Sequence, residues 1–307
     1  MKARPQLVTV LALAAVLAVG CGSDSAEPND LAGALPGDPE IVSYLDIEAA
    51  REGLDLPDDA DPADYDELGD PEDPTPEAEL VLAGASTLMH VTEPFTMRFE
   101  EDATANAFDH TQVSAAASSQ DLGGRAVILE TDQPFDEIAE ELEGAGFERD
   151  GDVLSGDSVN PEVAFPYVAD VGDGRILVAK ELAQTEEALA GDGEPGEAVE
   201  LLGELEASQR EVVTVTPDDS CITGFGVGGD PGGSELEIVL TVDGEADADA
   251  VAGELDLYPG DDPVALGEPE VDGESIRLSA TTESDPINPS NLIATGAIAG
   301  DGVYDCG

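Results

Sequence analysis

The chain has 307 residues and carries 71 acidic against 10 basic side chains, a formal charge of −61. Nucleic acid and anionic lipid are poor partners for such a surface, because binding to either requires a basic face. Hydrophobic residues make up 41 % of the sequence, which excludes the class of wholly disordered chains.

The first twenty residues have the pattern of a secretory signal peptide. Lys2 and Arg4 place positive charge at the start, and an apolar run of about fourteen residues follows from Leu7 to Gly20. The run is shorter than the ~20 residues that a membrane-spanning helix needs. We therefore predict that residues 1–20 are removed. An uncleaved membrane anchor is the alternative, and the short run disfavours it.

The run ends in Leu17-Ala18-Val19-Gly20-Cys21, which resembles the lipobox of bacterial lipoproteins, with Ala18 where leucine is usual. The resemblance implies cleavage before Cys21, a diacylglyceryl group on its thiol and often an acyl chain such as palmitate on the new amine. The implied partner is the cell membrane, reached on its extracytoplasmic face through lipid on Cys21. An ordinary secretory signal with a chance cysteine is the alternative. Residues 21–38 would form an acidic tether.

The acid excess persists after cleavage. Lys2 and Arg4 leave with the signal and every acid follows Cys21, so eight bases remain and the formal charge becomes −63 (8 − 71). Lys180 is the only lysine left. This composition favours adaptation to high salt, as in halophilic bacteria, with non-specific cations around the surface. A dedicated cation-binding surface is the alternative, and the spread of acids along the whole chain disfavours it.

The two cysteines beyond Cys21 form an even pair, Cys221 and Cys306. In an oxidising compartment such a pair predicts a disulfide. A closed loop of roughly 85 residues would stabilise the fold by up to ~4.5 kcal/mol in the chain-entropy model. Metal ligation by only two thiols is the weaker hypothesis.

The first folded segment reads as a strand from Ile41 to Asp46 and a helix from Ile47 to Gly53. Residues 56–79 are dense in Asp, Glu and Pro, and their Asp-Pro steps disfavour both helix and sheet, so we predict an acidic loop. The loop crowds Asp58, Asp59, Asp61, Asp64 and Asp66 without the spacing of a calcium-binding EF-hand. An alanine-rich helix is expected from Ala103 to Ser119.

Two later stretches read alike. Arg125 to Ser155 and Glu235 to Ser279 each give a strand, a helix and a hairpin that turns at Asp-Gly. A second hairpin at residues 167–179 and helices at 181–190 and 197–208 lie between them, followed by strands at 211–216 and 221–227. We predict an α+β fold of two related units, residues 39–192 and 193–307, each an antiparallel sheet with helices packed on one face. Chance similarity of common elements is the rival explanation.

The opening Leu35-Pro-Gly-Asp38 and the strand–helix–hairpin units resemble the uncharacterised two-repeat lipoproteins of actinobacteria. That resemblance implies no known chemistry.

Three features could be mistaken for a functional site. Gly224-Phe-Gly-Val-Gly-Gly229 imitates a dinucleotide-binding loop, but a strand rather than a helix is predicted next, which favours a flexible hairpin. His90 and His110 lack the spacing of a zinc motif, and Asp109 beside His110 is suggestive only as a neighbour. We predict no catalytic, cofactor-binding or metal-ligating residues.

The sequence therefore favours a non-enzymatic, membrane-anchored envelope lipoprotein with a binding or assembly role, whose partner would be another envelope protein. Two alternatives remain open. A substrate-binding lipoprotein of an importer would require a deep cleft between domains. An envelope hydrolase would require a histidine within hydrogen-bonding reach of a nucleophile.

Overall fold

The computed structural model describes residues 27–57, 69–70, 73–75, 80, 103–121, 124–156, 165–191, 196–214, 221–231, 233–244, 248–254 and 264–282. Its helices are α1 Pro28–Ala32, α2 Ile47–Gly53, α5 Ala103–Ala107, α6 Phe135–Gly144, α7 Leu182–Ala190, α8 Glu197–Leu202 and α9 Ala248–Glu254, with a 3-10 turn at His110–Gln112. Its strands are β1 Ile41–Asp46, β2 Gly69–Asp70, β3 Asp73–Pro74, β4 Val113–Asp121, β5 Gly124–Thr131, β6 Glu148–Asp150, β7 Val153–Ser155, β8 Tyr167–Gly172, β9 Arg175–Ala179, β10 Gln209–Thr214, β11 Ile222–Gly229, β12 Glu235–Val242, β13 Val264–Leu266, β14 Glu270–Asp272 and β15 Ser275–Thr282.

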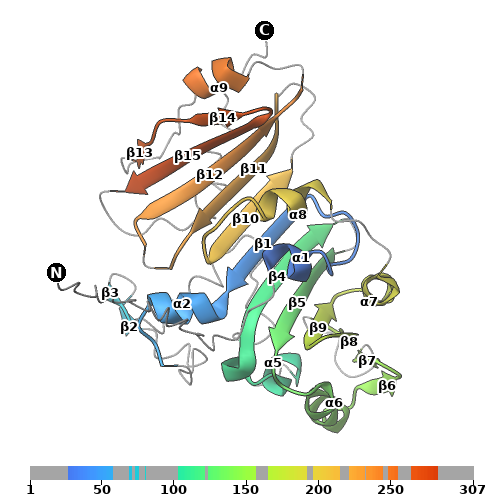
Figure 1. Cartoon of the computed structure of the whole chain (residues 1–307). Coiled ribbons are helices and arrows are strands. Elements are labelled where there is room, and N and C mark those ends of the chain that lie inside the picture. Colours follow the sequence, from blue (N-terminus) through green and yellow to red (C-terminus); the bar gives the residue numbers. More distant parts are fainter. Residues whose placement is uncertain are drawn as a thin grey trace, which may run out of the picture.

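One long antiparallel sheet runs through the molecule. Its strand order is β13-β15-β12-β11-β10-β1-β4-β5-β9-β8-β7-β6, with β14 also paired to β15. The first strand of the chain, β1, lies in the middle, between β10 and β4 (Figure 1). The combination of helices with an antiparallel sheet confirms the predicted α+β class.

The helices cover both faces of this sheet, so the predicted arrangement of two sheets with helices on one face each is wrong: α1 and α2 flank β1 in the chain and pack on opposite faces. α1 and α8 lie side by side over the central strands on one face, where Leu31, Leu35 and Leu205 share a core with Val42 and Val212 (Figure 1). On the other face, α2 and α6 pack with β5 and β9 in a second core, and α9 packs with β12 and β15 in a third. The first core thus spans the middle of the sheet on one face. The second and third cores share the opposite face, one toward each end of the sheet.

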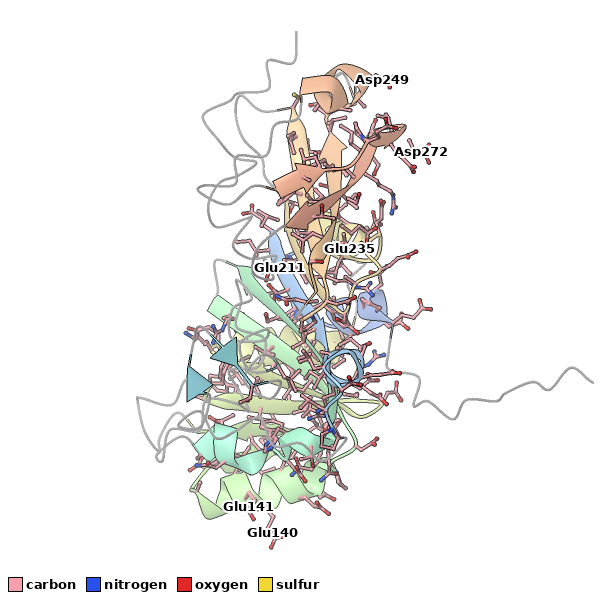
Figure 2. The ribbon with its side chains drawn as sticks, turned by 90° about the vertical axis from the view of Figure 1, so that its left-hand side faces the viewer. Glu140, Glu141, Glu211, Glu235, Asp249 and Asp272 are labelled. Carbon is pink, nitrogen blue, oxygen red and sulfur yellow. The ribbon has the colours of Figure 1, made fainter. Side chains whose placement is uncertain are left out.

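A row of buried polar side chains lies between the second and third cores. Ser118 of β4, Ser43 of β1 and Glu211 of β10 are directly opposite one another in the strand register, so they share one face of the sheet. All three have no exposed surface. Val127 and Val227 continue the row at its two ends and belong to the second and third cores. Figure 2 shows Glu211 within the sheet, while Glu140 and Glu141 project outward from α6.

Several elements lie where the sequence predicted them. β1 and α2 have the predicted bounds, and the Asp46 carboxylate caps α2 by accepting a hydrogen bond from the Ala49 amide at 2.8 Å. β5, α6 and the β6–β7 hairpin follow in the predicted order. α6 begins after Pro134, and the hairpin turns at Gly151 with φ of 63°. Local signals were sufficient for these elements because caps and turn residues define them.

The predicted helix from Ala103 to Ser119 is wrong. Only α5 and the short turn at His110–Gln112 are helical, and the chain then enters β4, a central strand. Ala115 and Ala117 of β4 face α1, and their small side chains leave room for Leu31 to pack closely on the sheet. Pairing with β1 and β5 therefore outweighs the helix propensity of alanine, which amounts to less than about 1 kcal/mol per residue.

Two boundaries also differ from expectation. α1 lies inside the segment predicted as tether, with Leu31 fully buried, so the folded part begins by Pro28. α8 ends at Leu202, with Gly203 as its C-cap, instead of continuing to Ser208, and Leu205 is buried from the turn that follows. The expected loop at 56–79 and the C-terminal tail lie mostly or wholly outside the described residues. No helix in the described part is long and apolar enough to span a bilayer.

Candidate functional site

A groove of about 610 Å³ lies between α2 and the segment that enters β4. α2 contributes Glu48, Arg51 and Glu52 to its lining, and Asp55 and Asp132 come from neighbouring loops. The groove therefore presents four carboxylates around one guanidinium group. Its charge favours cations in general, but no three His, Cys, Asp or Glu side chains within the described ranges converge as ligands of a single metal ion.

The arginine of this groove fastens α2 to the sheet. Arg51 is only 7 % exposed. It donates one hydrogen bond to the His110 carbonyl oxygen at 2.8 Å and a longer one to the Val113 carbonyl oxygen at 3.5 Å. These carbonyls belong to the turn that starts β4. Arg51 thus satisfies backbone acceptors in a buried position, which is a structural role.

Asp109 holds the same turn through its carboxylate. One oxygen, Oδ1, accepts hydrogen bonds from the Thr111 amide at 3.1 Å and hydroxyl at 2.6 Å, and Oδ2 accepts one from Gln112 Nε2 at 2.6 Å. These hydrogen bonds hold the pKa of Asp109 below its usual value. The Gln133 side chain ties the turn to α5 by accepting from the Asp109 amide and donating to the Ala107 carbonyl.

The Asp109–His110 pair is therefore explained by local structure. His110 is 2 % exposed, and its carbonyl oxygen is the one that Arg51 binds. Both carboxylate oxygens of Asp109 accept hydrogen bonds from Thr111 and Gln112. The sequence left this pair open as a suggestive neighbour, and the geometry assigns it to turn formation. His90 lies outside the described residues.

The glycine-rich motif forms most of β11. It leads by a turn into β12, so its glycines do not lie between a strand and a helix N-terminus as a phosphate-binding loop requires. Instead they allow close packing. A Cβ atom at Gly226 would lie 3.3 Å from Leu205 Cδ1, and one at Gly228 would lie 3.0 Å from Ala207 Cβ. The motif is thus the first strand of the expected hairpin, and it lies beneath α8 and the turn that follows it.

The described arginines contact aromatic rings, backbone carbonyls or carboxylates of the fold, although the Arg277 side chain is 42 % exposed and that of Arg149 31 %. Three lie over aromatic rings at 5.1–5.4 Å, namely Arg125 over Phe165, Arg149 over Phe135 and Arg210 over Tyr44. Desolvation by burial lowers the pKa of Arg125 and Arg210 and raises that of the Tyr44 phenol. Sequence reasoning missed these pairs because their members lie 14 to 166 residues apart.

The two other arginines in the described part, Arg175 and Arg277, link separate elements of the fold. Arg277 pairs with Glu204 at 2.8 Å and approaches Glu237 at 3.7 Å, which joins β15 to the turn after α8 and to β12. Arg175 donates to the Asp30 carbonyl oxygen at 3.2 Å, which joins β9 to α1. Lys180, in contrast, has an exposed side chain. The charge that the described surface offers to a partner is therefore mainly carboxylate.

The residues predicted for anchoring and cross-linking are placed only in part. Cys221 is 1 % exposed beside the start of β11, whereas Cys21 and Cys306 lie outside the described residues. The five aspartates considered as calcium ligands also lie outside them. The structure therefore brings none of these predicted residues together in its described part, and both the lipidation and the disulfide stay predictions.

The chain matches no family model and no curated protein. Among solved structures, it is similar to TP0453 in crystal forms III and IV, with TM-scores of 0.44 and 0.45 and 8 % sequence identity in both. The alignments cover 87 % of this chain and 98 % and 96 % of the TP0453 chains. Similarity at this level supports no statement about function.

Proposed function

We propose that this chain is a lipid-anchored lipoprotein on the extracytoplasmic face of a bacterial membrane, with a binding or assembly role. The lipobox at Cys21 supports the anchor. The observation that carries the role is that the described arginines are engaged by groups of the fold itself, which leaves a surface whose charge is mainly carboxylate. Such a surface favours an envelope protein with a basic face as partner over nucleic acid or anionic lipid.

The short tether supports a position close to the bilayer. Six residues lie between Cys21 and Pro28, the start of α1, so seven Cα–Cα steps join them. A fully extended chain of that length spans at most about 25 Å. Lipid on Cys21 would therefore hold the α1 and α8 side of the molecule near the membrane surface, with the outer strands free to meet a partner.

We further propose that the fold consists of two related units joined at the β1–β10 pair. The strands of the two units correspond when they are counted outward from this pair. The first unit then has the order β1, β4, β5, β9, β8, and the second has β10, β11, β12, β15, β14. α1 and α8 precede the first strand of each unit, and α6 and α9 follow the third. In the sequence we had matched the hairpin β6–β7 with β14–β15. In this arrangement the hairpin that corresponds to β14–β15 is β8–β9, and β6–β7 is an addition to the first unit.

The ends of the two opening helices support this relationship. Leu31, Gly33 and Leu35 match Leu201, Gly203 and Leu205 without a gap. The two glycines end their helices in nearly the same conformation, with φ and ψ of −66° and −14° at Gly33 and −70° and −12° at Gly203.

In-cell crosslinking at native salt tests the assembly role. The lipidated protein would be purified and analysed by mass spectrometry. A stoichiometric envelope partner, together with acylated Cys21 at the mature N-terminus, is the expected result. A Cys21→Ala variant, which lacks the acyl acceptor, should lose membrane association. A protein recovered without a partner contradicts the assembly role, and an unmodified N-terminus elsewhere contradicts the anchor.

The importer alternative is less well supported. Substrate-binding proteins of importers close two domains around a ligand by bending at hinge segments. Here five residue pairs, from Ile41–Val213 to Leu45–Gln209, join the two halves into one sheet. A continuous sheet resists hinge bending because bending would break its hydrogen bonds. This favours the assembly role.

A further inference from the structure

The register of the central strand pair relates the two halves by a local twofold axis. Val42 and Val212 lie directly opposite each other in the β1–β10 pair. The ungapped match that aligns Gly33 with Gly203 has an offset of 170 positions. The same offset relates Val42 to Val212, so these two valines are equivalent in the match. A residue that faces its own equivalent lies on a twofold axis. The axis therefore passes through the Val42–Val212 pair.

The elements around this axis follow the symmetry in part, because each opening helix packs on the first two strands of its own unit, whereas the third strand that each contacts is not an equivalent one. α1 packs on β1, β4 and β5, while α8 packs on β10, β11 and β1, and both helices lie on the same face of the sheet. On the opposite face, α6 and α9 cover the cores of their own units. The Asn29 side chain of α1 is close to Gly203 at the end of α8, so the two helices meet beside the axis.

One contact at the axis is not symmetric. Tyr44 lies directly opposite Arg210, whose guanidinium carbon is 5.4 Å from the centre of the tyrosine ring. At the equivalent pair on the other side of the axis, Glu40 and Thr214 meet instead, and the Thr214 amide donates to the Glu40 carbonyl oxygen at 2.8 Å. Pairing of one half with its own copy in the same register would set Tyr44 against Glu40 and Arg210 against Thr214.

We infer that α1 with β1 and α8 with β10 form an internal docking interface between two pseudo-symmetric halves, and that the Tyr44–Arg210 pair selects pairing of unlike halves within one chain. The inference rests on the two-unit part of the proposed function and is independent of lipidation. Pairing of unlike halves keeps the stacked cation, whereas pairing of like halves loses it. The partner that fits the β1 surface is therefore the second half of the same molecule.

Cleavage between the halves of the folded, full-length chain tests this interface. A protease site would replace residues 192–195, between α7 and α8, and the chain would be cut after folding. The two fragments are expected to stay folded and to elute together in 2 M NaCl. A double-mutant cycle on the cut chain would then use Tyr44→Leu, Arg210→Met and the double variant.

Each single substitution should raise the dissociation constant of the fragments roughly three- to tenfold, the range expected for loss of a cation–π contact. The double variant should be no weaker than the weaker single one, because the same contact is lost. Arg210→Lys should weaken the interface less than Arg210→Met, since it keeps the charge. Phe135→Leu is the matched control, because it removes the Arg149 stack at 5.2 Å within the first half and should leave the fragment affinity unchanged.

Several outcomes would overturn the inference. These are additive effects in the double variant, an equal effect of Phe135→Leu, and fragments that unfold as soon as the chain is cut. An uncut chain that elutes as a dimer with exchanged halves would overturn the assignment of the partner to the same molecule. An unmodified N-terminus would contradict the anchor alone and leave this cycle unaffected.

Discussion

Alanine or valine at Gly226 would crowd the side chains that pack on β11 from the turn after α8 and from β10. A Cβ atom at this position would lie 3.3 Å from Leu205 Cδ1, closer than most Cβ contacts in proteins, and 3.4 Å from Val212 Cγ2, at the edge of ordinary van der Waals contact. Neighbouring side chains would have to move by a few tenths of an ångström. Overpacking of this kind costs about 1–3 kcal/mol. Alanine recovers about 0.4–1 kcal/mol by restricting the unfolded chain.

We therefore expect Gly226→Ala to lower the free energy of unfolding by about 1 kcal/mol. Gly226→Val should lower it by about 3 kcal/mol, because its two methyl groups enter the same space. Urea unfolding followed by circular dichroism at 2 M NaCl would measure both. Gly144→Ala is the control, since a Cβ atom there has no neighbour within 4 Å, and it should stabilise α6 by up to about 1 kcal/mol. A Gly226→Ala variant as stable as the wild type would refute the close-packing argument.

Other measurements address the groove, the charge and the cysteines. Arg51→Met should destabilise the fold by about 1.5–3 kcal/mol in urea unfolding, because buried carbonyls lose a charged donor, whereas exposed Glu52→Gln should change little. Because the pKa of Asp109 is lower in the folded than in the unfolded chain, its ionised carboxylate stabilises the fold at pH values above the unfolded pKa near 3.9. This contribution is lost as the pH falls through the folded pKa. The stability difference between wild type and Asp109→Asn should therefore shrink from pH 6 to pH 3, and a constant difference would argue against the role of this carboxylate. The urea midpoint should rise between 0.1 M and 2 M NaCl as repulsion is screened, while a flat response would contradict salt adaptation. Thiol labelling of the unfolded, unreduced protein should leave Cys221 and Cys306 unmodified, and labelling of both would disprove the disulfide.

Predictions that depended on local signals agree with the structure. The predicted Asp-Gly turn lies at Gly151, and the structure shows that the Asp46 cap and the start of α6 after Pro134 likewise fix adjacent residues through neighbouring atoms. The alanine-rich segment of β4 had no such signal. Its conformation depends on the strands beside it, which come from residues 41–46 and 124–131.

The candidate groove could not be predicted for the same reason. Arg51 and the carbonyl oxygen of His110 are 59 residues apart, and nothing in either local sequence indicates that they meet. Asp109 could be noticed in the sequence only as a neighbour of His110. Its use as the cap of a turn became evident from its bonds to Thr111 and Gln112.

The sequence alone determined the charge, the signal-like N-terminus and the helices and hairpins with clear caps, because composition and short-range bonding depend on adjacent residues. Only the tertiary structure decided that β1 and β10 pair at the centre of one sheet, that the glycines of β11 admit the turn after α8, and which rings, carbonyls and carboxylates the described arginines contact. These features are contacts between residues far apart in the chain. Their free energy comes from burial and pairing that exist only once the strands have met.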